Sequence, residues 1–381
     1  MLYLEGEDQI STDMENIIIY GGSFDPIHNG HLRMAQAASL SFNADVIFVP
    51  AKSPRWKKPD SSIKDRLAML RTAIRFEGSS SFSISLFEVN SKAEVNYTID
   101  TVQYFKKRFP KARLYFLLGA DSVETFPKWK DAEEIAELAT PIYCPRPGIA
   151  LDDKILEKYG MVRLPFDHSG DVSSSAVRSL QSTDIPLKVR EYIEAHELYY
   201  IRELKSHMKP TRLKHSIRVA NLAYYIAQKN RVEGYWRAYV AGLLHDIGKY
   251  IPIEEQRKLA KENYPEYADL PDWAFHQFAG AVKAKEIFGI QDEVILDAIA
   301  YHATGKMHMS PLAKILYCAD KIEPGRGYDS RPLIDACLKN YYVGFLTVLG
   351  ANKEYLMTQK GYIIDNPLTE SCMSLYLGEE N

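Results

Sequence analysis

The chain of 381 residues is poor in cysteine and has no long apolar run. Its four cysteines lie far apart, with no C-x-x-C spacing, and they fit reduced cytoplasmic thiols better than a disulfide framework. Residues 1–16 contain five acidic side chains and no basic one, which is unlike a signal peptide. Since no stretch approaches eighteen uninterrupted apolar residues, we expect no membrane span.

The sequence also lacks a strong excess of charge of either sign. Its 47 basic and 50 acidic side chains leave a net charge of −3, which gives no general attraction to nucleic acid or anionic membranes. We therefore expect a cytoplasmic protein with neither as a partner, and leave open a homo-oligomer. The chain length and a hydrophobic content of 46% favour two globular domains over one.

One stretch near the start, residues 20–32, reads Y-G-G-S-F-D-P-I-H-N-G-H-L. It follows the apolar run 17–20, which predicts a buried strand, and precedes a helical pattern that begins at Asn29. A glycine turn between a strand and a helix presents backbone N–H groups to an anion. His28 and His31, three residues apart, can face the same pocket, so we expect this turn to bind phosphate.

Strand and helix patterns alternate through the first 200 residues. We expect strands at 45–49, 82–89, 114–118, 141–144 and 162–166, and helices at 63–76, 98–109 and 131–138. This alternation predicts a parallel sheet covered by helices, with ligands beyond the carboxyl ends of the strands.

Helical periodicity alone follows Tyr200. We expect helices at 213–230, 235–247, 253–263, 275–288, 293–302 and 312–322, and a terminal helix and tail after Ala351. The predicted organisation is an acidic lead (1–16), an α/β domain (17–203) and an all-α domain (204–381).

The helical part contains histidines and aspartates suited to divalent metals, although any one such histidine is more often structural. The candidates, with Asp246 as the bridging ligand, are His215, His245, Asp246, His276, His302 and Asp320. His245 and Asp246 stand beside the apolar run 241–244, where an uncompensated carboxylate would be costly to bury. The six residues could hold two metal ions.

The stretch at 20–32 resembles nucleotidyltransferases with a G-x-F-D-P-x-H-x-G-H signature, and among them the nicotinate-nucleotide adenylyltransferases. The resemblance implies a Rossmann-like domain that transfers adenylate from ATP, with Mg²⁺, to nicotinate mononucleotide. It extends to Y-T-x-D-T at 97–101, G-A-D at 119–121 with Trp129 after it, and S-S-S-A-V-R at 173–178. The implied catalytic residues are His28, His31, Lys57 and Arg178; the implied substrate-binding residues are Gly21, Gly22, Ser23, Phe24, Thr98, Gly119, Asp121, Trp129, Ser173 and Ser174.

Four of these assignments have alternatives. Trp129 could fill the core, and the serines at 173–175 could cap a helix. Lys57 takes the place of the lysine of the family's P-P-H-K element, but Arg55 and Trp56 replace its proline and histidine, so Lys58 is a second candidate. Thr98 could simply cap a helix.

The pattern L-L-H-D-I-G-K at 243–249 is the signature of the HD phosphohydrolase superfamily. A-Y-H-A-T-G at 300–305 and A-D-K-I-E-P-G-R at 319–326 resemble its YqeK-type branch. This resemblance implies symmetrical hydrolysis of diadenosine tetraphosphate to two ADP at a pair of divalent metals, Fe or Mn. Asp246 and Lys249 would be catalytic, and Arg326 would bind substrate.

Other functions stay open for both halves. The first could adenylylate another phosphate-bearing substrate, such as phosphopantetheine. The second could be a nucleotide sensor without turnover, or could hydrolyse another nucleotide such as a guanosine polyphosphate.

Overall fold

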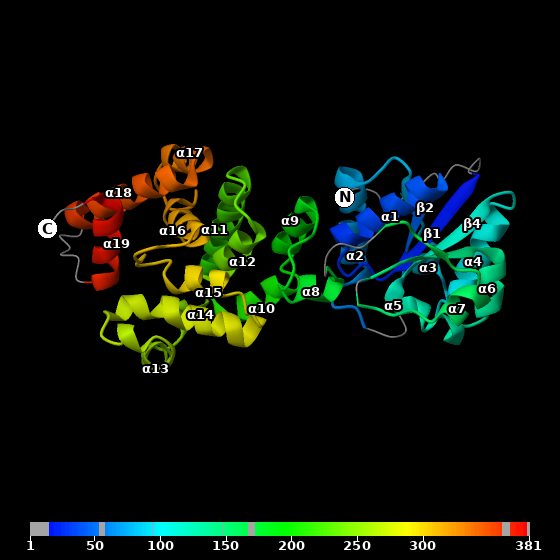
Figure 1. Ribbon diagram of the computed structural model, residues 1–381, viewed down its shortest axis with the longest axis horizontal. Helices are drawn as coiled ribbons and strands as arrows, with labels where there is room; N and C mark the ends of the chain where they lie inside the picture. Colours follow the sequence, from blue (N-terminus) through cyan, green and yellow to red (C-terminus); the bar gives the residue numbers. More distant parts are fainter. Residues whose placement is uncertain are drawn as a thin grey trace. The chain divides into compact units, whose positions relative to one another are not determined.

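The computed structural model describes residues 15–52, 58–93, 95–146, 148–166, 172–359 and 366–378 (Figure 1). They form two compact units. The first runs up to Arg178 and takes in Asp184–Tyr199; the second contains Ser179–Thr183 and the chain from Tyr200 onward. The predicted fold class, an α/β domain followed by an all-α domain, is confirmed.

The first unit is built on a sheet of six parallel strands in the order β3-β2-β1-β4-β5-β6. The strands are β1 (Asn16–Gly22), β2 (Asp45–Pro50), β3 (Phe82–Ile84), β4 (Arg113–Gly119), β5 (Thr140–Cys144) and β6 (Val162–Arg163). The order reverses at β1, where neighbouring connections run to opposite sides and leave a crevice for ligands. The register pairs Gly21 with Val49 and Gly119 with Cys144, so the glycines that end β1 and β4 lie at the carboxyl edge.

The helices of the first unit lie around this sheet or, like the last of them, pack on another helix (Figure 1). They are α1 (Asn29–Phe42), α2 (Ile63–Glu77), α3 (Phe87–Asn90), α4 (Thr98–Arg108), α5 (Ala120–Val123), the 3-10 turn η1 (Phe126–Lys128), α6 (Ala132–Leu138), α7 (Asp153–Lys158), α8 (Ser174–Arg178) and α9 (Leu187–Ala195). The strand expected at 82–89 ends at Ile84, and the chain turns into α3. There the Phe87 ring stacks on Tyr104 of α4, with centroids 4.2 Å apart, instead of continuing the ladder.

In the described part of the second unit, all regular elements are helical. They are α10 (Tyr200–His207), α11 (Pro210–Lys229), α12 (Trp236–Leu244), η2 (Ile247–Tyr250), α13 (Ile253–Asn263), η3 (Pro265–Tyr267), η4 (Asp272–Ala274), α14 (Phe275–Phe288), α15 (Glu293–Ala300), α16 (Pro311–Ile322), α17 (Arg331–Lys339), α18 (Tyr341–Gln359) and α19 (Pro367–Leu377). α11 packs against α12 and α16, and α14 packs against η2 and α15. Among the described residues, none of the helices has the length and apolar character that crossing a membrane requires.

Candidate functional site

A pocket of about 610 Å³ lies at the carboxyl edge of the sheet in the first unit, within the size range of small-molecule sites. Most of the substrate-binding and catalytic residues expected in this unit line it. They are Gly21, Gly22, Ser23, Phe24, His28, His31, Thr98, Gly119, Asp121, Trp129, Ser173 and Ser174. Lys57 lies outside the described residues. The strand ends, the glycine turn and the start of α8 therefore converge, as ligand binding in a parallel sheet requires.

His28 and His31 hold each other at the start of α1. The backbone N–H of His31 donates to Nδ1 of His28 (3.3 Å), and that of His28 donates to Nδ1 of His31 (3.2 Å). The rings stack with centroids 3.6 Å apart. Because each Nδ1 accepts a hydrogen bond, a neutral ring carries its hydrogen on Nε2. The cap thus fixes both the orientation and the tautomer of two hydrogen-bond donors.

The glycine turn before α1 is supported by Arg66, which the sequence analysis did not single out. This arginine is 1% exposed, and its Nη1 donates to the carbonyl oxygens of Ser23 (2.7 Å) and Ala51 (2.8 Å). Gly22 packs closely here, since an added Cβ would lie 3.0 Å from the buried ring of Phe24, which would have to shift slightly. The loop that lines the pocket is therefore fixed by a buried cation and tight packing.

Arg178 is close to the turn but is not among the residues that line the pocket. Its Nη1 donates to the carbonyl oxygen of Asp25 (2.6 Å), and its Nε pairs with the carboxylate of Asp60. Ser174, four residues earlier, lines the pocket and donates from Oγ to the carbonyl oxygen of Pro26 (2.9 Å). In this structure Arg178 connects α8 to the glycine turn.

Trp129 and Tyr20 provide aromatic surface in the pocket. Trp129 is half-buried and packs edge-to-face on Phe116, with centroids 6.0 Å apart. Tyr20, 4% exposed, has a hydroxyl with no hydrogen-bond partner among the described residues. Burial raises the pKa of Tyr20 well above its usual value, and the nearby Cys144 and Asp121 add to the shift. A buried, unpaired hydroxyl at a pocket wall is costly and suits a ligand or water partner.

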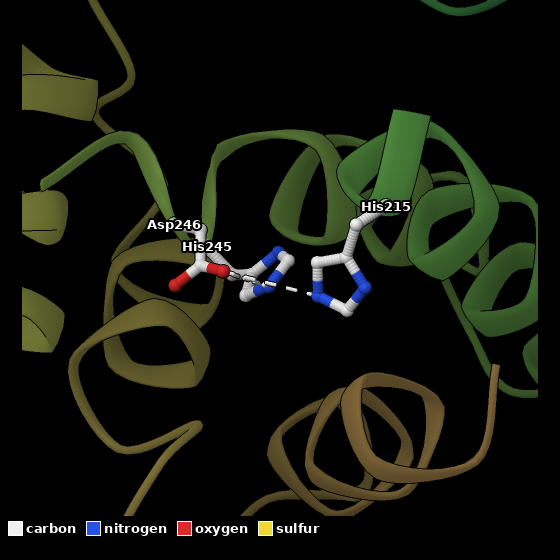
Figure 2. A group of neighbouring side chains, drawn as sticks. All are labelled: His215, His245 and Asp246. Carbon is white, nitrogen blue, oxygen red and sulfur yellow. Dashed lines mark ion pairs between the residues drawn. The ribbon is translucent and has the colours of Figure 1, made fainter. Parts of the chain in front are cut away.

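The six histidines and aspartates expected to bind metal converge in the second unit. His215, His245 and Asp246 form one group with potential ligand atoms within 4.8 Å of one another, and Asp246, His276 and His302 form another. Figure 2 shows the first group, with the His215 ring and the Asp246 carboxylate directed toward each other. Asp320 joins them, with Oδ1 3.2 Å from Nε2 of His215 and 3.6 Å from Nε2 of His245.

The two carboxylate oxygens of Asp246 face different groups of histidines. Its Oδ2 lies 3.3 Å from Nε2 of His245 and 3.8 Å from Nε2 of His215. Its Oδ1 lies 3.5 Å from Nε2 of His276 and 3.7 Å from Nε2 of His302. One oxygen thus faces each pair of histidines, which is the arrangement needed for a bridging carboxylate.

Each histidine presents Nε2 to the cluster because its Nδ1 is held from behind. Backbone carbonyl oxygens three residues earlier hold Nδ1 of His245 (2.7 Å), His276 (2.7 Å) and His302 (2.8 Å). For His215 the partner is Oε1 of Glu323, at 3.1 Å. Such outer contacts orient histidine ligands toward metals. The buried Nε2 of His245 has no hydrogen-bond partner among the described residues, so the cluster fits a divalent metal.

Burial and neighbouring charge act in opposite directions on the aspartates of the cluster. Burial alone raises the pKa of Asp246, but His245 and His302 hold it well below its usual value. Burial likewise raises the pKa of Asp320, but the neighbouring His215 and His245 rings outweigh this effect, so this pKa is also lowered. Burial lowers the pKa of His276 to about 3, and His302 and Lys249 contribute to the shift. Ionised carboxylates and a neutral imidazole are the forms that bind metal.

Basic side chains stand beside the cluster. Nζ of Lys249 is 3.4 Å from Nε2 of His276, and Nη2 of Arg326 is 2.6 Å from Oδ1 of Asp320. Arg212, which the sequence analysis did not identify, pairs through Nη1 with Oδ2 of Asp246 at 2.7 Å. It precedes His215 by three residues, so it lies on the same face of α11. The cluster therefore combines acidic side chains suited to metal with positive charge suited to phosphate.

Known proteins match both units. Residues 19–180 match the family model described as cytidylyltransferase-like, and residues 212–325 match the HD domain model. A Mycoplasma pneumoniae protein named "Probable nicotinate-nucleotide adenylyltransferase/Ap4A hydrolase" is 35% identical over 316 residues, covering 82% of this chain and 90% of that protein. A Mycoplasma genitalium protein of the same name is 34% identical, covering 82% and 88%.

The first unit also matches by itself. A Bacillus subtilis protein named "Nicotinate-nucleotide adenylyltransferase" is 35% identical over 191 residues, covering 49% of this chain and 99% of that protein. The similarity to the Mycoplasma proteins extends across both units. The chain therefore belongs to the nicotinate-nucleotide adenylyltransferase/Ap4A hydrolase family, in which a cytidylyltransferase-like domain precedes an HD domain.

Proposed function

We propose that the protein is a bifunctional enzyme. The first unit transfers adenylate from ATP to nicotinate mononucleotide, giving deamido-NAD and pyrophosphate. The second hydrolyses diadenosine tetraphosphate symmetrically to two ADP. The observation that carries the proposal is the 35% identity to a relative with both activities in its name, over 90% of that relative's length. The pocket and the histidine–aspartate cluster supply a site for each reaction.

In the first unit, the phosphate of nicotinate mononucleotide attacks the α-phosphorus of ATP and pyrophosphate leaves. The chain supplies no covalent nucleophile; catalysis comes from positioning and from stabilising charge on the phosphates. Nε2–H of His28 and His31 donates to phosphate oxygens, with Lys57 or Lys58 and Mg²⁺ as further counter-charges. Arg178 contributes by holding α8 against the glycine turn. Trp129 stacks on the pyridine ring, and Asp121 lies beside the nucleotide.

In the second unit, His215, His245, Asp246, His276, His302 and Asp320 would hold a pair of divalent metals, with Fe or Mn favoured by the mixed imidazole and carboxylate donors. When bound, the metals would act as Lewis acids toward phosphate oxygens and make water more acidic. Lys249, Arg212 and Arg326 neutralise the charge of the polyphosphate chain, which holds the substrate against the cluster.

His→Asn and His→Ala variants test the first activity. Asparagine Oδ1 can replace histidine Nδ1 as the acceptor in the cap, but asparagine has no counterpart of Nε2–H. H28N and H31N should therefore keep the stability of the first unit and lose adenylyl transfer, whereas the alanine variants should lose both. Phosphopantetheine serves as the competing acceptor in the same assay. Wild-type turnover in H28N and H31N, or a preference for phosphopantetheine, would contradict the proposal.

Asp246→Ala tests the second activity. Asp246 serves both groups of ligands, so the variant should lose bound metal and tetraphosphate hydrolysis together, while adenylyl transfer by the same chain continues. Metal content is measured on the purified protein, and products are identified from diadenosine tetraphosphate and, separately, from guanosine polyphosphates. If the variant retains metal and hydrolysis, the histidines are structural. If the wild-type protein cleaves only the guanosine polyphosphates, the proposed substrate, diadenosine tetraphosphate, is wrong.

A further inference from the structure

The orienting partner of His215 is different in kind from those of the other three histidines in the cluster. In the other three, Nδ1 contacts a backbone carbonyl oxygen of the same helical turn, which no side-chain substitution removes; these are His245, His276 and His302. Nδ1 of His215 instead faces Oε1 of Glu323, a side chain 108 positions away in the sequence. The orientation of His215 therefore depends on the packing of α11 against the end of α16.

Glu323 is itself held by three contacts and is 1% exposed. Nε of Arg218 donates to its Oε2 at 2.5 Å, and Nη2 donates to Oε1 at 3.2 Å. The backbone N–H of Gly325 donates to Oε2 at 2.6 Å. Three N–H donors, two of them from a guanidinium, thus face this buried carboxylate, and such contacts favour its ionised form.

The carboxylate of Glu323 can orient the His215 ring. When Nε2 of His215 gives its lone pair to a metal beside Asp246 and Asp320, the ring hydrogen is on Nδ1. The carboxylate of Glu323, which only accepts hydrogen bonds when ionised, is then the acceptor for Nδ1–H. Arg218 follows His215 by one turn of α11, so the arginine and the histidine grip the same carboxylate from one helix. This forms a carboxylate–histidine pair of the type that raises metal affinity.

We propose that Glu323, fixed by Arg218, is a positioning residue that orients His215 for metal binding in the second unit. The proposal rests on the proposed metal-dependent function of that unit. It adds two residues that do not themselves touch metal or substrate. It also makes metal affinity depend on contacts outside the six ligands.

Four variants of the full-length protein test this proposal. E323A removes the carboxylate, and E323Q keeps an acceptor for Nδ1 but loses the ionic pair with Arg218. R218M removes the guanidinium. G325A displaces it, since the added Cβ would lie 2.4 Å from Nη2 of Arg218, a flexible end that can move. The matched control is R237M, which removes another arginine–carboxylate pair, Nε to Oδ2 of Asp292 at 2.6 Å. This pair lies at the N-terminal ends of α12 and α15, whereas His245 and His302 follow the C-terminal ends of these helices.

The readouts are Mn²⁺ affinity by chelator competition, the visible spectrum of the Co²⁺-loaded protein, and the melting temperature without metal. E323A should bind Mn²⁺ about 10–100-fold more weakly, the range typical of lost outer contacts to metal ligands, with an altered Co²⁺ spectrum. E323Q, R218M and G325A should show smaller losses, and R237M none.

Two outcomes overturn the proposal and differ from each other. If E323A, R218M and G325A bind Mn²⁺ as the wild type does, with an unchanged Co²⁺ spectrum and only a lower melting temperature, the pair is merely structural. The proposed function then stands. If the wild-type protein binds neither Mn²⁺ nor Co²⁺, the metal-dependent function fails, and this inference fails with it. Should E323A not fold, R218M and G325A still decide the question.

Discussion

Gly248 packs so closely against α14 that one added methyl group should disturb the histidine–aspartate cluster. A Cβ at this position would lie 2.3 Å from the carbonyl oxygen of His276 and 2.6 Å from the backbone nitrogen of Gly280. Real Cβ atoms essentially never approach closer than 3.0 Å, so η2 must move from α14 by several tenths of an ångström. Both clashing atoms belong to the backbone, so no side-chain rotation relieves the overlap.

We expect Gly248→Ala to lower the free energy of unfolding of the second unit by about 1–3 kcal/mol, the usual cost of overpacking. For a unit of this size that is a fall in melting temperature of roughly 2–12 °C. The shift separates Asp246, two residues before Gly248, from His276, whose Nε2 lies 3.5 Å from Oδ1 of Asp246. Metal affinity should therefore fall as well.

Thermal unfolding of the full chain, with and without Mn²⁺, measures both effects. The matched control is Gly350→Ala in α18, where an added Cβ meets nothing within 4 Å. This change should stabilise the helix by about 0.5–1 kcal/mol. A Gly248→Ala protein that melts at or above the wild-type temperature and binds Mn²⁺ equally well would refute the reasoning.

Three further predictions concern single side chains. Tyr20→Phe removes a buried hydroxyl that has no hydrogen-bond partner in the described parts of the chain, so stability should stay the same or rise slightly. Substrate affinity should fall about 2–10-fold for one lost hydrogen bond. Lower stability with normal KM values would contradict this prediction. Trp129→Ala should raise the KM for nicotinate mononucleotide by roughly 5–100-fold, as expected for lost stacking, and change the KM for ATP little. Trp129→Phe should restore most of the affinity for nicotinate mononucleotide. Equal effects on both substrates would exclude selective stacking. The pKa of Glu323 lies at about 2 in the folded protein against an ordinary value of 4.5, so its ionised form stabilises the fold above pH 4.5 and this contribution disappears as the pH falls toward 2. The stability difference between wild type and E323Q in metal-free protein should therefore shrink over that range; a constant difference would mean that the charge of Glu323 contributes nothing.

The architecture could be predicted from the sequence because its signals are local. Apolar runs such as 114–118 alternate with amphipathic segments, and this period indicates a parallel sheet whatever the tertiary detail. The strand expected at 82–89 was too long, since Phe87 packs on α4 and the alternation of apolar residues continues past the point where pairing stops. Sequence period cannot distinguish a side chain that faces a sheet from one that packs on a helix beyond its end.

The site was predictable where a residue type is itself suited to phosphate or metal, and less so where support comes from a distance. The six histidines and aspartates were selected for their chemistry, and the structure brings them together. Arg66, Arg212 and Glu323 were missed because their roles depend on partners that only the fold places near them. The one signal for Arg212 in the sequence is its position three residues before His215.

The reciprocal cap of His28 and His31 joins two properties that are usually independent. If the first turn of α1 frays, the helix loses its end and both imidazoles lose their fixed direction in the same event. Activity would then be lost through a small local opening, long before the sheet melts. Hydrogen exchange at the His28 and His31 amides would report how often the enzyme passes through that inactive form.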